Sequence, residues 1–272
     1  MRLEDATIIK IDLGKYLLIK EKVYVCPTTN HLLLNIFIEL CYHSYMISLK
    51  DFLNHFLSIF FPYRCHVCKN SCDFGVVLCG DCKEKLRKAV HKPELVQDTI
   101  GNFNIYTMSS YDDFTSDIVK IIKYRPSKRL AKILAEICAE KADLKNFLQA
   151  DDVIIPVPMH EKRLEERGFN QAWVLAEIYA ERVGCHFSPA LIRSRYTKPQ
   201  ASCDESERNT NLDNAFCLNP DIIKTAFKGK RLIVVDDVAT TGTTLLKSVE
   251  PLKELESKEI IALVVSHSYK KY

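Results

Sequence analysis

The chain is poor in glycine, in low-complexity sequence and in uninterrupted apolar runs. Glycine accounts for only 8 of 272 residues, and no G-x-G-x-x-G follows a predicted strand, which disfavours a dinucleotide-binding fold. The apolar stretch 32–61 is broken by polar residues too often to cross a membrane, and no signal peptide opens the chain. The net charge of +3 is too small to indicate nucleic-acid binding by itself. We therefore expect a cytoplasmic protein with one sizeable domain and one small one.

Cysteine is unevenly distributed, with five of the 11 cysteines between Cys65 and Cys82. Such a cluster favours a metal site in a reducing compartment over a disulfide framework. Cys65-x-x-Cys68 and Cys79-x-x-Cys82 are two knuckles joined by a segment that we expect to form a small hairpin around Gly75. Four thiolates at this spacing predict a tetrahedral Zn²⁺ site. A rubredoxin-like iron site is the alternative, whereas a thioredoxin-type redox pair comes singly.

The run from Arg231 to Thr244 predicts a phosphate site. Leu232 to Val235 are continuously apolar, as in a parallel strand covered on both faces. Asp236 and Asp237 follow at the carboxyl end of this strand, where ligands bind in open α/β sheets. Gly242 and its threonines then open a helix, predicted from 243 to about 255, whose first N–H groups suit a phosphate. A ribose hydroxyl pair, held directly or through Mg²⁺, fits the acidic pair.

Strands and helices alternate through the last two-thirds of the chain. Buried strands are predicted at 152–158 and 260–265, with a further strand at 104–111. Helices are predicted at 83–91, 117–123, 129–148 and 170–183, the last ended by Gly184. The polar stretch 160–171 is either a charged surface loop or a functional loop. This order predicts an α/β fold with a mostly parallel sheet and flanking helices.

The acidic strand and the Thr-Thr-Gly-Thr-Thr loop resemble the PRPP-binding motif of type I phosphoribosyltransferases. Ala239 departs from that motif, because a larger aliphatic or aromatic residue is commoner there, and this puts local packing in doubt. Further matches to the ComF family, which joins an amino-terminal zinc ribbon to a type I phosphoribosyltransferase-like domain, run from about Leu57 to the end. They include Phe61-Pro62 before the cysteines, Pro156-Val-Pro158, Arg167-Gly-Phe-Asn-Gln171, Arg193, Arg195, Thr197, Gln200, Arg208, Asn211, Ala215-Phe216 and Gly229-Lys230.

This resemblance implies the roles of the site residues. The paired acids would hold the ribose hydroxyls and the loop the 5-phosphate of PRPP, which gives Asp236, Asp237, Ala239, Thr240, Thr241, Gly242, Thr243 and Thr244. Residues 156–160 would face pyrophosphate and 196–211 would form a mobile loop over the site. On the pyrophosphate side we place Pro156, Val157, Pro158, Arg193, Arg195 and Lys198, because cations and Mg²⁺ stabilise that leaving group. The metal ligands are Cys65, Cys68, Cys79 and Cys82.

The resemblance also implies three domains and two candidate functions. We expect an extension at 1–56, of which the part before Met46 is poorly packed or lies outside the working protein, then a ribbon with a basic helix at 57–92 and the phosphoribosyltransferase-like domain at 100–272. The first hypothesis is a protein of DNA uptake and natural transformation that binds PRPP with Mg²⁺ and single-stranded DNA, the latter through the basic residues of 83–92, beside a helicase-type partner. The alternative is an active phosphoribosyltransferase with an unidentified base or amine as acceptor.

Overall fold

The computed structural model describes residues 63–73, 75–96, 103–110, 114–193 and 215–267 of the chain. These residues belong to two compact units. One contains Tyr63, Arg64 and the described part of 70–76, and the other contains Cys65–Lys69 and the chain from Val77 onward. The expected extension 1–56 with its Met46 start, and the expected loop 196–211 with Lys198, lie outside the described residues, as does Arg195.

The first unit holds one short antiparallel pair. Strand β1 (Tyr63–Arg64) pairs with β2 (Ser71–Cys72), and Tyr63 lies opposite Cys72. Gly75 has a φ of 77°, a turn conformation that glycine adopts without strain. The expected hairpin around Gly75 is therefore wrong in its position, because the pairing joins segments on either side of the first cysteine knuckle in the sequence.

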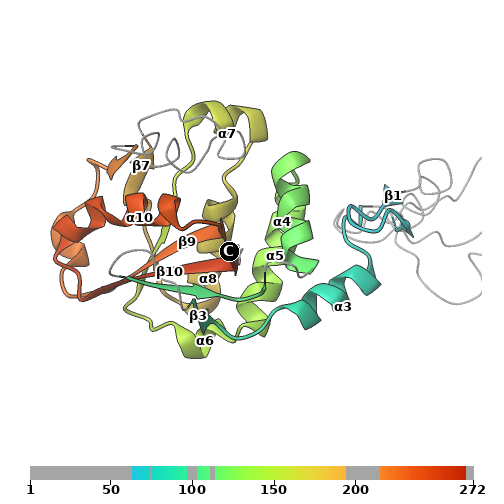
Figure 1. Ribbon diagram of the computed structural model, residues 1–272, viewed down its shortest axis with the longest axis horizontal. Helices are drawn as coiled ribbons and strands as arrows, with labels where there is room; N and C mark the ends of the chain where they lie inside the picture. The colour runs from blue at the N-terminus through green and yellow to red at the C-terminus, as the bar shows by residue number, and fades with distance from the viewer. Residues whose placement is uncertain (1–62, 74, 97–102, 111–113, 194–214, 268–272) are drawn as a thin grey trace, which may run out of the picture. The chain divides into compact units, whose positions relative to one another are not determined.

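The second unit is built on a six-stranded sheet with the order β3-β4-β10-β9-β5-β6 (Figure 1). Its strands are β3 (Glu94–Leu95), β4 (Asn104–Thr107), β5 (Val153–Pro156), β6 (His186–Phe187), β9 (Arg231–Ala239) and β10 (Glu259–His267). All neighbours are parallel except the edge pair β3 and β4. A separate antiparallel pair is formed by β7 (Leu191–Arg193) and β8 (Phe216–Leu218). The mostly parallel sheet predicted from the sequence is confirmed.

Helices cover both faces of this sheet. They are α3 (Gly80–Ala89), α4 (Phe114–Tyr124), α5 (Lys128–Lys141), α6 (Leu144–Phe147), α7 (Glu161–Arg167), α8 (Gln171–Val183) and α10 (Thr243–Val249), with 3₁₀ turns η2 (Lys224–Phe227) and η3 (Pro251–Leu255). Leu232 and Val234 of β9 pack with α10 and η3 in one core cluster. Ile233 and Val235 alternate to the other face, where α8 contacts β5 and β9. No described helix has the length and apolar character that a membrane span requires.

Two predicted helices run further than those observed, and a stretch expected to form a loop contains a short helix. The helix expected to run from 243 to about 255 ends at Val249, because Pro251 has no N–H to continue the α-helical ladder, and a 3₁₀ turn follows. The helix expected at 129–148 ends at Lys141, and Asp143 with a φ of 55° separates it from α6. The polar stretch 160–171 contains a short helix, α7, which Gly168 ends in the left-handed conformation.

Candidate functional site

The acidic pair lies where the chain leaves the sheet in opposite directions. From β5 the chain proceeds through α7 and α8 to β6, and from neighbouring β9 it proceeds through α10 to β10 on the other side. This is the topological switch point at which open α/β sheets bind ligands. Pairing of β9 with β5 stops at Val235 opposite Pro156, whereas pairing with β10 continues to Ala239. Asp236 and Asp237 therefore follow the last residue that is paired with β5.

Burial and one cation set the electrostatics of this pair. Asp237 is only 7 % exposed, and Lys123 of α4 donates to its Oδ1 at 3.3 Å. Oδ1 of Asp236 accepts from the backbone N–H of Asp237 at 2.8 Å. Burial, and next the charge of Asp237, raise the pKa of Asp236, while the charge of Asp237 raises the pKa of Lys123. The two carboxylates thus lie close together and largely away from water. A bound cation or hydroxyl donors would stabilise their negative charge.

The threonine loop turns from β9 into α10. Gly242 precedes the helix with a φ of 71°, which a residue with a Cβ rarely adopts. The hydroxyl groups of Thr241 and Thr243 lie 2.9 Å apart, and Thr240 is exposed. Ala239 is 2 % exposed and belongs to the core cluster, so the small residue at this position is accommodated by packing. The loop brings threonine hydroxyls and helix-start N–H groups to the same edge as the acidic pair.

The turn after β5 faces this loop across the switch point. The backbone N–H of Val157 donates to the Val235 carbonyl at 2.9 Å, which holds the turn against β9. Asn170 caps α8, and its Nδ2 donates to the Val157 carbonyl at 2.9 Å. A cavity of about 300 Å³ lies beside the turn. Its lining includes Pro156 and Pro158 but neither aspartate, so it is a separate space from the acidic pair.

Besides Lys123, an arginine acts on the acidic pair. The guanidinium of Arg193 lies 5.2 Å from the ring centre of Phe216. Burial, and next the charge of Arg163, lower the pKa of Arg193 to about 10, whereas Asp236 acts in the opposite direction. Arg167 of α7 donates to Gln171 Oε1 at 3.4 Å and is close enough to oppose the raised pKa of Lys123. Arg193 thus adds positive charge near Asp236, whereas Arg163 acts on Arg193 and Arg167 acts on Lys123.

Sequence reasoning missed two parts of this arrangement. The sequence indicates only that Lys123 lies in a helix. Its partner, Asp237, belongs to β9, and nothing in the sequence near Lys123 points to it. Arg163 and Arg167 lie in the polar stretch 160–171, for which the sequence allows either a surface loop or a functional loop, and the glycine that ends α7 is the available signal.

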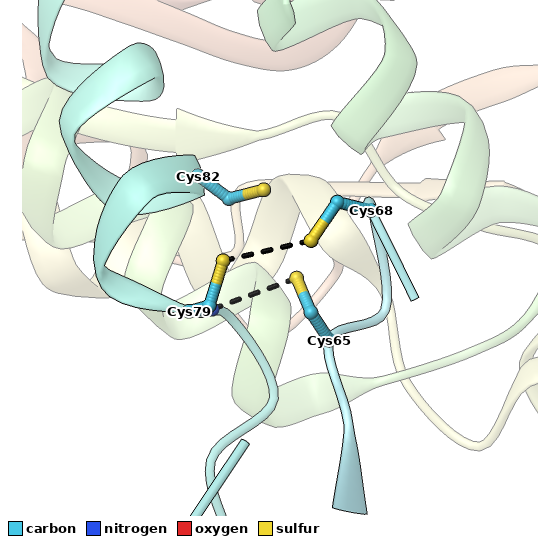
Figure 2. Close-up of side chains that lie close together, drawn as sticks. All are labelled: Cys65, Cys68, Cys79 and Cys82. Atoms are coloured by element: carbon cyan, nitrogen blue, oxygen red, sulfur yellow. Dashed lines mark hydrogen bonds between the residues drawn. The ribbon is translucent and has the colours of Figure 1, made fainter. Parts of the chain in front are cut away.

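The four expected metal ligands come together in one cluster (Figure 2). The Sγ atoms of Cys65, Cys68, Cys79 and Cys82 all lie within 4.8 Å of one another, and those of Cys68 and Cys79 are 3.6 Å apart. Zn–S bonds of about 2.3 Å in a tetrahedron place sulfur atoms about 3.8 Å apart, so the cluster fits this ion.

The surroundings of the cluster favour thiolate at one cysteine in particular. Burial opposes ionisation of Cys65, but the backbone N–H groups of Cys79, Cys68 and Val67 outweigh it and lower the pKa of Cys65 to about 6. Burial and the neighbouring thiols raise the pKa of Cys82. A metal ion supplies the positive charge that lets all four sulfurs ionise together.

Helix α3 begins directly after Cys79 and carries the basic residues predicted to contact DNA. Its Leu86 is fully buried, and the helix contacts α4 and α5. Arg87 of this helix pairs with Glu140 of α5. Lys83, Lys85 and Lys88 are exposed. Arg87, one of the basic residues predicted to contact DNA, is therefore already engaged within the protein.

Comparison with known proteins identifies the fold family. The model of the phosphoribosyl transferase domain matches residues 170–271. The chain is 27 % identical over 220 residues to competence protein F of Haemophilus influenzae, which covers 74 % of this chain and 95 % of that protein. It is 29 % identical to the DNA utilization protein YhgH of Salmonella typhimurium over 66 % of this chain and 80 % of that protein. Competence protein ComFC of Bacillus subtilis is 31 % identical over 62 % of each chain.

The matches extend beyond the phosphoribosyl transferase domain. The phosphoribosyl transferase model covers the acidic strand and the threonine loop, and the full-length relatives extend the likeness over most of the chain. The cysteine cluster has the ligands of a zinc ribbon. The chain is thus similar to ComF competence proteins over most of its length, and it carries a type I phosphoribosyltransferase-like domain.

Proposed function

We propose that this protein binds PRPP with Mg²⁺ at the acidic pair and the threonine loop, and that it acts in the cytoplasm in DNA uptake and natural transformation, handling single-stranded DNA with a helicase-type partner. The convergence of Asp236, Asp237 and the Thr240–Thr244 loop at the switch point of the sheet carries the first half of this proposal. The second half is supported by the relatives, which are named for competence and for DNA utilization.

The donor set suits a phosphorylated ribose. The threonine hydroxyls and the N–H groups at the start of α10 can bind the 5-phosphate, and the two aspartates can accept hydrogen bonds from ribose hydroxyls. Carboxylate oxygens beside phosphates are also the ligands that Mg²⁺ prefers, and the bound ion would neutralise the charge of the diphosphate. We infer that the diphosphate extends toward the 156–158 turn and Arg193, on the other side of the switch point.

The alternative function is transfer of the phosphoribosyl group to an acceptor. Arg193, which lies near Asp236, favours this alternative, because positive charge stabilises a departing diphosphate. Lys123 donates to Asp237 in this structure, so a ribose hydroxyl or a cation that binds this carboxylate would compete with Lys123 for it. A base or amine acceptor would be recognised by residues that no motif in this chain identifies.

Calorimetry of PRPP binding in the presence of Mg²⁺ tests the site. We expect replacement of Asp236 and Asp237 together by asparagine to weaken binding at least tenfold, because hydrogen bonds to a charged acceptor contribute about 1.5–3 kcal/mol each. The matched control is Asp221→Asn, an exposed aspartate in the turn after β8, outside the proposed site. Unchanged affinity in the double variant would place the ligand elsewhere.

A turnover screen separates the two functions. PRPP and Mg²⁺ are supplied with a panel of bases and amines, and release of pyrophosphate is followed. The binding role predicts no acceptor-dependent release above that of the double aspartate variant. Acceptor-dependent release that this variant lacks would establish the transferase instead. Normal transformation in a strain that lacks the gene would contradict the role in DNA uptake.

A further inference from the structure

An exposed cationic surface lies where α4 turns into α5. We define this α4–α5 corner as Tyr124, Arg125, Lys128, Arg129 and Lys132, all of which are exposed. The chain carries no acidic residue between Asp117 and Glu136. The two other lysines of this stretch, Lys120 and Lys123, form ion pairs with Asp117 and Asp237. Among the described residues, the four cations of the corner have no ion pair. Their charge is therefore available to an external anion.

Helix α3 offers less positive charge for the same number of basic residues. Asp81 and Glu84 are interspersed among Lys83, Lys85 and Lys88, and Arg87 is paired with Glu140. Its net charge is therefore small, whereas the corner presents four cations that no neighbouring acid offsets. A polyanion that approaches this unit is attracted more strongly to the corner.

The corner is held by a proline and a helix cap, and its cations stand at the start of α5, where they do not stabilise the helix. Pro126 separates the two helices, and the Ser127 side chain caps α5 by accepting from the backbone N–H of Leu130. Lys128 and Arg129 then occupy the first turn of α5, which has no acidic residue. Cations at a helix start oppose the helix dipole at a cost of about 0.3–1 kcal/mol each. Their placement is unfavourable for the isolated helix and favourable for a bound anion.

The corner also contains an exposed aromatic ring beside its cations. The Tyr124 side chain is 77 % exposed, the most exposed large apolar residue among those described. Exposed aromatic rings interleaved with cations are the arrangement by which proteins bind unpaired nucleotides, the rings stacking on bases and the cations contacting phosphates.

We propose that the α4–α5 corner is the surface that holds single-stranded nucleic acid, with phosphates on Arg125, Lys128 and Arg129 and an unpaired base stacked on Tyr124. The inference rests on the proposed role in DNA handling and adds its location, which differs from the predicted surface on α3. A duplex has no exposed base faces for Tyr124, so the ring directs the preference toward single strands.

Fluorescence anisotropy with a labelled oligo-dT and the full-length protein tests this location. One variant replaces Arg125, Lys128 and Arg129 by glutamine, and the matched control replaces Lys83, Lys85 and Lys88 by glutamine, so that each loses three positive charges. Each phosphate contact contributes about −0.7 to the slope of log affinity against log salt for single strands. We expect the corner variant to lower the steepness of that slope by about 2 and to bind at least tenfold more weakly at low salt. The α3 variant should retain most of the slope.

The Tyr124→Ala variant tests stacking separately from charge. It should weaken binding about tenfold and leave the salt slope unchanged, because it removes a base contact and no cation. Melting temperatures close to that of the wild type, measured for all three variants, establish that the fold is intact.

The possible failures can be told apart. If the wild-type protein does not bind the oligonucleotide at all, the proposed DNA role fails together with the inference. If it binds and the α3 variant loses the affinity while the corner variant keeps it, the DNA role stands and the corner is wrong. Equal affinity of the corner for duplex DNA, or for vesicles of anionic lipid, would overturn the assignment to single strands.

Discussion

Loss of one thiolate from the cysteine cluster should unfold its turns and spare the sheet. We consider Cys79→Ser, because the Cys79 sulfur lies 3.6 Å from that of Cys68 and its backbone N–H donates to the Cys65 sulfur at 3.5 Å. The substitution leaves three sulfur ligands for an ion that takes four in structural sites. Zinc should then bind far more weakly.

The magnitude follows from how little else holds this segment. Its buried apolar side chains outside the ligands are Val77, Leu78, Leu86 and Val90. Burying each contributes about 1.5–3 kcal/mol, so the four together contribute about 6–12 kcal/mol. Structural zinc contributes about 10–16 kcal/mol, as much as all four side chains. The turns around the cysteines should therefore lose their order, whereas the core of β9 and β10 shares none of these contacts.

Hydrogen exchange read by mass spectrometry measures the effect peptide by peptide. The amides of His66, Lys69 and Lys83, which donate to the backbone carbonyls of Val77, Cys65 and Cys79 at 2.9–3.0 Å, should exchange rapidly in Cys79→Ser and in the chelator-treated wild type. Peptides from β9 and β10 should keep their protection.

A neighbouring cysteine provides the matched control. Cys72 lies outside the four-sulfur cluster and donates to the Asn70 carbonyl at 3.5 Å, so Cys72→Ser should keep one zinc per chain. Full zinc occupancy in Cys79→Ser would remove this residue from the site. Loss of protection throughout β9 and β10 would refute the reasoning that the sheet does not depend on the metal.

Two further substitutions test the scaffold of the site. Asp152 is 1 % exposed and pairs with Arg231 at 2.5 Å, so Asp152→Ala should lower the free energy of unfolding by about 3–5 kcal/mol in denaturant titration, whereas exposed Asp151→Ala should not. Asp236→Asn should raise stability while it weakens PRPP binding, because burial raises the pKa of Asp236 from 3.8 to about 7. The folded wild type retains a proton there that the unfolded chain has released, so its stability falls as pH rises from about 4 to 7, and melting curves of the variant should lack this decline.

The fold was largely readable from the sequence because its signals are local. The apolar run Leu232–Val235 predicted the central strand, and Gly184 marked the end of α8. Helix ends that depend on one backbone conformation were harder to place. Asp143 ends its helix through a positive φ that aspartate only sometimes adopts, so the predicted helix ran too far.

Only the parts of the site that lie within one short segment of the sequence could be predicted. The acidic pair and the threonine loop are contiguous in sequence, and the four cysteines follow a recognisable spacing. The partner of Asp237 comes from α4, which precedes it by 114 residues. Such a contact is fixed by tertiary packing, and neither periodicity nor composition near Lys123 indicates it.

Helix α4 connects the two proposed binding surfaces, and this leads to the last prediction. Lys123 reaches Asp237 from the last turn of α4, and Arg125 lies two residues further on, in the corner. A ligand that places a cation or hydroxyl groups on Asp237 competes with Lys123 and so changes the end of α4. By thermodynamic linkage, PRPP with Mg²⁺ must then change the affinity for single-stranded DNA by the same factor as DNA changes the affinity for PRPP.

The Lys123→Gln variant tests this coupling. It keeps a long polar side chain but removes the ion pair, so the factor by which PRPP changes DNA affinity should approach one while each ligand still binds alone. Anisotropy titrations with and without saturating PRPP measure the factor, and Lys120→Gln, which removes an exposed pair on the same helix, is the control. An unchanged factor in Lys123→Gln would show that the two surfaces communicate by another route, and a factor of one in the wild type would show that they act independently.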